Sequence, residues 1–202
     1  MTWRRARSAF DHRDYDTALR RKIQSVLETA FHGTCASYFT QLSDSALARL
    51  HLVGDFRPES DEYARRCRDA VQRLGLEGQV VFHGYRSGVA EWYQACDIVL
   101  LASRREGLAR CMIEGLACGT PVVSFDVCSA REILEGHDCG RVAAQGDYAG
   151  LAAALGELAA DPALRARLGE NGVRAARRLF DPAPVAAAYV RLYRALSGGA
   201  GR

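Results

Sequence analysis

Short apolar segments that alternate with longer amphipathic ones are the feature that most restricts the fold of this chain. The apolar segments are rich in Val, Ile and Leu, as expected of strands that are buried on both faces of a sheet. They cover residues 49–53, 79–83, 97–102, 121–125 and 140–143, and helices are predicted over residues 59–74, 88–95, 109–118 and 129–134. This order predicts an α/β fold with a doubly wound, Rossmann-like parallel sheet.

The N-terminal end does not follow this pattern. Residues 1–16 are mostly charged and contain no plausible strand, so an irregular segment is expected there. Asp16 is suited to cap a helix that runs from about residue 17 towards residue 39. Because a doubly wound domain normally opens with a strand, the chain is expected to begin after the place of that strand, with one sheet edge left unpaired.

The C-terminal end is predicted to be helical. Asp161-Pro162 and Asp181-Pro182 each place a capping acid before a proline at the first helical position. We therefore assign residues 17–180 to the sheet domain, residues 181–196 to a C-terminal helix and residues 197–202 to a flexible, Gly-rich tail.

The composition excludes several classes of protein. The 202 residues are 49% hydrophobic and 25% charged with a net charge of +3, as in globular proteins with a core. Arginine pairs are scattered among acids without interleaved aromatics, so no nucleic-acid partner is expected. Seven irregularly spaced cysteines without a C-x-x-C motif fit no disulfide framework or zinc site. No apolar run approaches the ~20 residues of a membrane span. We expect a soluble, cytoplasmic protein, and leave open a peripheral attachment to the inner membrane face.

One stretch, SRREGLARCMIEGLACGTPVVSF from residue 103, carries the candidate site. The N–H groups of Gly107, Leu108, Ala109 and Arg110 would point from the carboxyl end of the preceding strand, where ligands bind in open α/β sheets. A helix N-terminus of this kind is suited to a phosphate or diphosphate, and the Arg110 side chain could add positive charge.

Two glutamates flank this anion site. If residues 106–114 were all helical, Glu114 would lie within about a quarter turn of Glu106 and ~12 Å further along the axis. Carboxylates beside a phosphate are better suited to accept hydrogen bonds from neutral hydroxyls, so the spacing suits a nucleotide sugar. On spacing alone, an equally good interpretation is that Glu106 is a first-turn acid favoured by the helix dipole and that Glu114 is a solvated surface residue.

The run DIVLLASRREGLARCMIEGLACGTPVVSF closely resembles the donor-binding segment of group 1, glycogen-synthase-like retaining glycosyltransferases of the GT-B fold. That family carries a Glu-x7-Glu motif in this context, and Glu106 and Glu114 match its two glutamates. LHLVGD, VVFHGY, WYQACDIVLL and REILEGHDCGRV also look like family landmarks in the family's order. The resemblance covers residues 50–146 and implies the C-terminal, donor-binding half of a GT-B enzyme.

The resemblance also implies a role for each site residue. Glu106 would bind hydroxyls of the transferred sugar and act in catalysis, and Glu114 would bind the ribose. Backbone N–H groups of residues 107–109, helped by Arg110, would hold the diphosphate. Tyr85 falls where the family's nucleobase loop lies, although packing of its ring in the core is nearly as plausible. No metal or other cofactor is implied, since the nucleoside-diphosphate sugar is the donor substrate.

The sequence departs from the family in two places. Many relatives have Gly or Pro at the position of Ala109, and Ala at that of Gly115, but small residues are kept. Near the N-terminus, Arg13 could take the place of a lysine that the family has before its first helix. Asp14, however, stands where the family has glycine after that lysine. A metal-binding Asp14-x-Asp16 pair is a weaker alternative, because Asp16 is a natural helix cap.

We therefore expect a glycosyltransferase that moves a hexosyl group with retention from a nucleoside-diphosphate sugar to a hydroxyl of a glycan, polysaccharide or glycolipid. The family's acceptor-binding half is missing from the matched region, so weak or no activity is expected of the chain alone. Self-association through residues 1–53, or a separate acceptor-domain chain, is the expected partnership. Two alternatives stay open: a non-catalytic module that binds nucleotide sugars or partners, and a related epimerase or phosphorylase.

Overall fold

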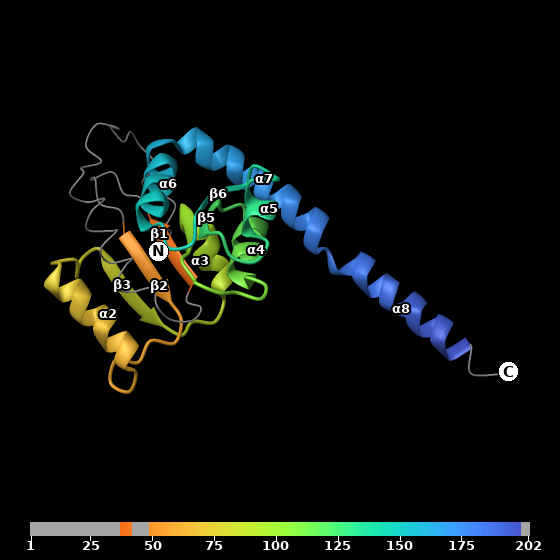
Figure 1. Cartoon of the computed structure of the whole chain (residues 1–202), viewed down its shortest axis with the longest axis horizontal. Helices are drawn as coiled ribbons and strands as arrows, with labels where there is room; N and C mark the ends of the chain where they lie inside the picture. The colour runs from red at the N-terminus through yellow and green to blue at the C-terminus, as the bar shows by residue number, and fades with distance from the viewer. Residues whose placement is uncertain (1–36, 42–48, 199–202) are drawn as a thin grey trace.

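The computed structural model describes residues 37–41, by their backbone only, and 49–198. Six strands form one sheet in the order β3-β2-β1-β4-β5-β6 (Figure 1). The strands are β1 (Ser37–Gln41), β2 (Arg49–Val53), β3 (Val80–Gly84), β4 (Ile98–Leu101), β5 (Val122–Phe125) and β6 (Gly140–Ala143). The pairs β2/β3, β4/β5 and β5/β6 are parallel, which confirms the predicted α/β class and all five predicted strands within one or two residues.

The strand β1 corrects the sequence-based expectation. It lies between β2 and β4 and runs antiparallel to both, with Tyr38 paired to Leu52 on one side and to Leu100 on the other. The helix expected towards residue 39 is therefore wrong over residues 37–39, where Tyr38 and Phe39, like the following Thr40, favour a strand. β1 therefore lies in the middle of the sheet, and among the described strands the edges are β3 and β6. The predicted segment 1–16 and helical residues 17–36 lie outside the described residues.

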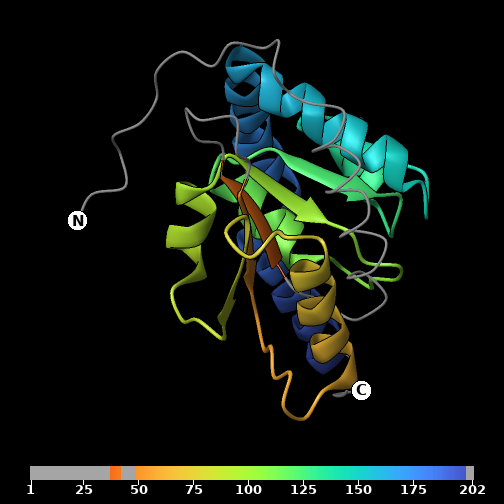
Figure 2. The same ribbon diagram turned by 90° about the vertical axis from the view of Figure 1, so that its left-hand side faces the viewer.

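The helices agree with the predicted segments. They are α2 (Glu62–Arg73), α3 (Val89–Ala95), α4 (Arg110–Ala117), α5 (Ala130–Leu134), α6 (Tyr148–Ala160), α7 (Pro162–Phe180) and α8 (Pro182–Gly198). α2 begins three residues after the predicted start, and Asp61 caps it by accepting hydrogen bonds from the N–H groups of Tyr63 and Ala64. Asp161 caps α7 as predicted, with Pro162 in the first turn. Figure 2 shows α3 on one side of the strands and α2 and α6 on the other.

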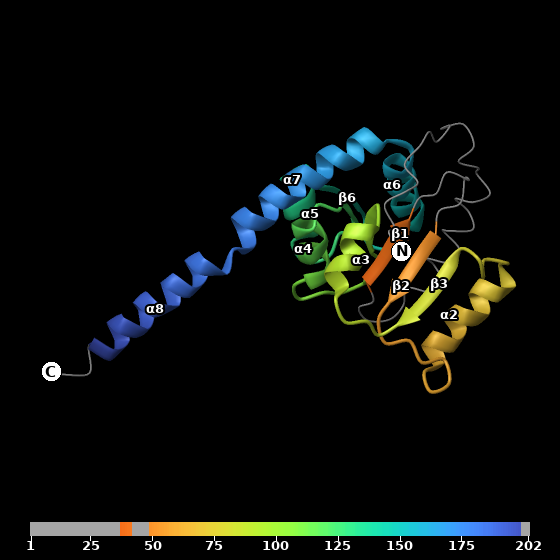
Figure 3. The same cartoon turned by 180° about the vertical axis from the view of Figure 1, so that it is seen from behind.

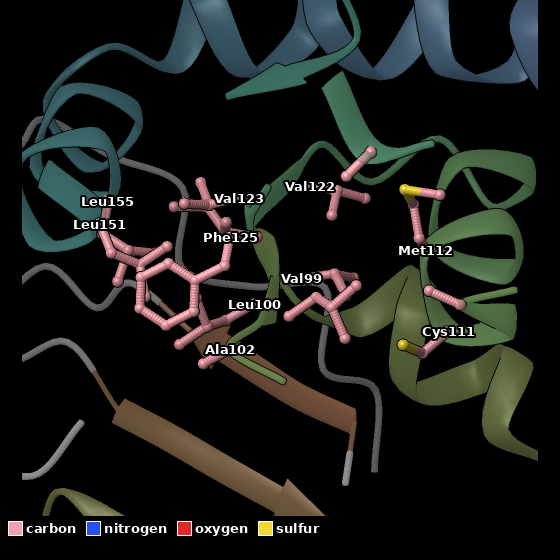
Figure 4. Packing of buried hydrophobic residues seen from close by; sticks show 14 of the residues in the cluster. Val99, Leu100, Ala102, Cys111, Met112, Val122, Val123, Phe125, Leu151 and Leu155 are labelled. Atoms are coloured by element: carbon pink, nitrogen blue, oxygen red, sulfur yellow. The ribbon is translucent and has the colours of Figure 1, made fainter. Parts of the chain in front are cut away.

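Alternate residues of β4 and β5 face opposite layers of helices (Figure 4). Val99 and Val122, which are paired in the parallel register, point towards Cys111 and Met112 of α4. Leu100, Val123 and Phe125 point to the opposite face, where Leu151 and Leu155 of α6 lie. All residues of β4 and β5 are buried. This double-sided burial explains why the two strands read as continuous apolar runs.

Helix α7 packs across α4 at very short range, and glycines make this possible. A Cβ atom at Gly169 would overlap the carbonyl oxygen of Gly119, and one at Gly172 would lie 3.0 Å from Leu116 Cδ2. Gly119 itself follows the end of α4 with a φ of +80°, a left-handed conformation that glycine commonly adopts just after a helix. The backbones of α4 and α7 are therefore in direct contact.

Helix α8 leaves the domain, as Figures 1 and 3 show. It begins after Asp181, whose carboxylate accepts a hydrogen bond from the N–H of Ala183. It continues two residues beyond the predicted end at residue 196, and Ser197 Oγ donates to the carbonyl of Tyr193. All its side chains up to residue 197 are exposed. Within the described ranges, no helix combines the length and apolar character that a membrane span needs. The predicted domain boundaries stay predictions.

The contact between α4 and α7 makes a testable prediction for Gly169→Ala. Alanine normally stabilises a helix interior by about 1 kcal/mol relative to glycine. Here the added methyl group would collide with the Gly119 backbone, so we expect the free energy of unfolding to fall by about 1–3 kcal/mol. Urea unfolding measures it, with Glu170→Ala at the neighbouring exposed position as the control. A stabilised Gly169→Ala protein would contradict the close packing.

Candidate functional site

The candidate site lies where β4 ends at the carboxyl edge of the sheet. Ser103 is buried directly after the strand, and the chain then crosses the edge in an irregular loop up to Ala109. Helix α4 begins at Arg110, with the buried Ala109 as its N-cap residue and no side-chain hydrogen bond to the cap. The N-terminus of α4 therefore faces the loop without a carboxylate or hydroxyl cap.

The loop is not helical before α4. Residues 106–109 lie outside the helix, so the ~12 Å rise from Glu106 to Glu114, which holds only if residues 106–114 are all helical, does not apply. Gly107, with no atom within 4 Å of a Cβ at its position, offers an open approach to the backbone. Glu106 is half-buried, whereas Gly107 and Leu108 are exposed.

Two side chains from distant segments hold this loop. Cys128, which follows β5 with a φ of 53°, donates its thiol hydrogen to the carbonyls of Glu106 and Gly107. Gln145, which follows β6, donates from Nε2 to the carbonyl of Arg104 at 3.1 Å. Sequence reasoning missed both residues. The only available signal was that each comes just after a parallel strand, and so at the same sheet edge as the loop.

Glu114 is fixed on the first two turns of α4 by two partners. The hydroxyl of Tyr93 on α3 donates to Oε2 at 3.1 Å. Arg110 Nη2 donates to Oε1 at 3.3 Å, in an ion pair one helical turn apart. The Glu114 side chain keeps 36% of its exposure and that of Arg110 keeps 85%. The structure thus places the carboxylate half in the core and half at the surface, and not simply in solvent.

Tyr85 does not pack in the core, so that alternative is wrong. It follows Gly84, whose φ is +68°, at the end of β3, and 79% of it is exposed. Within the described part of the chain, no hydrogen bond or ring contact joins Tyr85 to the loop or to α4. The structure therefore places Tyr85 at the carboxyl end of a strand, but does not bring it into contact with the other predicted residues.

A cavity of about 590 Å³ adjoins the N-terminal turns of α4. One wall is formed by Leu108, Arg110, Ile113 and Glu114, and the other by the junction of α7 and α8. The second wall consists of Leu179, Phe180, Asp181, Pro182, Val185, Ala186 and Tyr189. Three predicted site residues thus face one hollow of mostly apolar character.

Metal-binding side chains do not gather near this site. Among the residues that the structure describes, no three His, Cys, Asp or Glu side chains come together in a way that could hold an ion. The weaker alternative of a metal at Asp14 and Asp16, and the substitute role of Arg13, lie outside the described residues.

His83 of β3 forms a pair with His51 of β2. His51 Nδ1 and His83 Nε2 lie 2.9 Å apart, so one ring donates and the other accepts, and Trp92 packs against His83. Burial, then His83 and Arg49, lower the pKa of His51 to about 4. Burial and Arg86 lower the pKa of His83. Both rings are suited to the neutral form.

Comparison with known proteins gives one family. The sequence model described as "Glycosyl transferases group 1" matches residues 31–161. A lipopolysaccharide core biosynthesis mannosyltransferase, LpcC, of Rhizobium leguminosarum bv. viciae is 30% identical over 145 residues, which are 72% of this chain and 41% of the relative.

Solved structures give the same result. The fold matches a sucrose-phosphate synthase from Thermosynechococcus elongatus with a TM-score of 0.68 and 30% identity, over 74% of this chain and 39% of that one. It also matches Anabaena HepE, solved in complex with UDP-glucose, with a TM-score of 0.64 or 0.63 in different complexes and 29% identity, over 73% of this chain and 40% of HepE. The chain spans about two fifths of the length of the proteins it matches.

The histidine pair predicts a pH dependence of stability. Since the pKa of His51 is about 4 in the folded chain and 6.5 in the unfolded one, the unfolded chain binds more protons between these values. The free energy of unfolding should fall as the pH drops from 6.5 to 4, by up to about 3 kcal/mol from His51. Urea unfolding of the wild type and His51→Phe across this range measures the difference. Equal pH slopes for the two proteins would rule the effect out.

Proposed function

The chain belongs to the group 1 glycosyl transferases, and from this premise we propose that it binds the nucleoside-diphosphate sugar from which such an enzyme transfers a sugar. The observation that carries the proposal is the loop between β4 and α4, which contains Glu106 and leads into a helix N-terminus without a side-chain cap, with Glu114 on the second turn of that helix. HepE, a structural relative, was solved with UDP-glucose, which supports this class of donor.

The diphosphate is proposed to bind at the start of α4. The unpaired N–H groups of a helix N-terminus carry roughly half a positive charge in total, which favours an anion. Gly107 leaves the backbone open, and Arg110 is exposed enough to turn towards a phosphate. The backbone of Leu108 and Ala109 completes this cradle.

The hydroxyl groups of the donor are assigned to the two glutamates. Glu106, in the loop, binds the transferred sugar and is the catalytic candidate, while Glu114, on α4, binds the ribose. A carboxylate accepts but does not donate hydrogen bonds, so both side chains suit hydroxyl donors. The exposed Tyr85 ring, at the end of β3, is proposed to face the nucleobase.

The proposed reaction transfers a hexosyl group with retention to an acceptor hydroxyl. The N-terminus of α4 would stabilise the charge that develops on the leaving diphosphate. No metal or cofactor is part of the proposal. The acceptor is proposed to be a glycan or lipid-linked sugar, in line with the lipopolysaccharide role in the name of LpcC, and the site of action to be cytoplasmic. The surface that binds the acceptor is proposed to lie on a further domain or chain.

Ligand choice tests the proposed diphosphate cradle. Titration calorimetry without added metal should show that UDP, GDP or ADP, and the corresponding sugar conjugate, binds more tightly than the nucleoside monophosphate. The reason is that a monophosphate cannot reach both the ribose site and the helix N-terminus. Equal or absent binding across the panel, by protein with the circular dichroism of a folded α/β chain, would refute the proposal.

Substitution of the two glutamates separates their roles. Glu114→Ala should weaken binding of the bare nucleoside diphosphate by about 1.5–3 kcal/mol, the range for hydrogen bonds to a charged group. Glu106→Ala should leave binding of the bare nucleotide almost unchanged and weaken only binding of the sugar conjugate. The matched control is Glu132→Ala on α5, at an exposed position. If both site variants changed both ligands equally, the assignment of roles would be wrong.

A further inference from the structure

Tyr93 is a large aromatic residue whose polar end reaches the candidate site from inside the core. Only 1% of the residue is exposed. Its hydroxyl nevertheless donates to Glu114 Oε2 at 3.1 Å, so the buried end of the carboxylate has a fixed donor. A charge-assisted bond of this kind in a poorly solvated place is stronger than one in water.

The position of Tyr93 is itself constrained from two sides. Thr120, buried after α4, donates from Oγ1 to the Tyr93 carbonyl at 2.6 Å. On the ring side, a Cβ added at Gly115 of α4 would lie in van der Waals contact with Tyr93 Cδ1, at 3.6 Å, and only 2.9 Å from Val99 Cγ2. The ring therefore packs beside α4, the helix that carries Glu114.

The two oxygens of Glu114 differ in how firmly they are held. Oε2 is bound by the buried Tyr93, whereas the partner of Oε1 among the described residues is Arg110, whose side chain is 85% exposed. An exposed ion pair of this kind contributes little and is easily exchanged. A ligand can therefore replace Arg110 at Oε1 while Oε2 keeps its partner.

We propose that Tyr93 is a positioning residue that holds Glu114 so that Oε1 meets the ribose hydroxyls of the donor, while Arg110 turns from Glu114 to the diphosphate. The inference rests on the proposed function, because it needs a nucleotide at this site. It assigns the hydroxyl of Tyr93 to the selection of ribose-containing ligands, through an aligned carboxylate and not through contact with the nucleotide.

The test compares the binding of UDP, GDP and ADP, and of their 2′,3′-dideoxy analogues, to Tyr93→Phe and to the wild type. Loss of the hydroxyl should lower the affinity for the ribose nucleotide by about threefold to tenfold. The affinity for its dideoxy analogue should change by no more than about twofold. In a Glu114→Ala background, Tyr93→Phe should have no further effect on either ligand. A purely structural role would weaken both kinds of nucleotide alike.

Tyr148→Phe is the matched control, because the Tyr148 hydroxyl is buried on α6 without a hydrogen-bond partner among the described residues. It should change neither affinity. If Tyr93→Phe does not fold, Thr120→Val, which removes the bond to the Tyr93 carbonyl, should show the same selective loss. Wild-type protein that binds none of UDP, GDP and ADP would overturn the proposed function and this inference with it. Wild-type protein that prefers the ribose form, with an equal preference in Tyr93→Phe, would overturn this inference alone.

Discussion

The close packing of α4 between the sheet and α7 is the constraint on which the rest of the structure depends. On the sheet side, Gly115 leaves no room for a side chain above Val99, and on the other side Gly169 meets the backbone of Gly119. Protein interiors are packed at nearly crystalline density, so α4 has little freedom to rotate or slide. A helix held in this way presents its N-terminus and its polar residues in one fixed orientation.

The chemistry of the site follows from that orientation. The N-terminus of α4 points to the carboxyl edge of the sheet, where the loop from β4 arrives, and Glu114 lies between a buried hydroxyl and an exposed arginine. Cys128 and Gln145 fasten the loop to the segments after β5 and β6. Anion binding at helix N-termini needs backbone N–H groups in place before the ligand arrives, and this framework provides them.

The sequence predicted those parts whose physical cause is local. Strands β4 and β5 are buried on both faces, so their sequences are unbroken apolar runs. Asp161-Pro162 indicates a helix start because the aspartate caps the helix and the proline fits its first turn. The parts that were missed depend on residues far apart in sequence. Nothing near Cys128 shows that its thiol meets the Glu106 carbonyl, or that Tyr93 reaches Glu114. Strand β1 was missed because its mixed polar and aromatic residues gain their strand partners only from β2 and β4.

The most direct measurement of the central claim is an amide ¹H–¹⁵N NMR titration of the chain with a nucleoside diphosphate that calorimetry shows to bind. If the start of α4 holds the diphosphate, the largest shifts should come from the N–H groups of Gly107, Leu108, Ala109 and Arg110. The amide signals of α2, which lies on the side of the strands opposite to α3 (Figure 2), should remain nearly unchanged. Shifts confined to α2 or α8, with the four loop amides unmoved, would contradict the account.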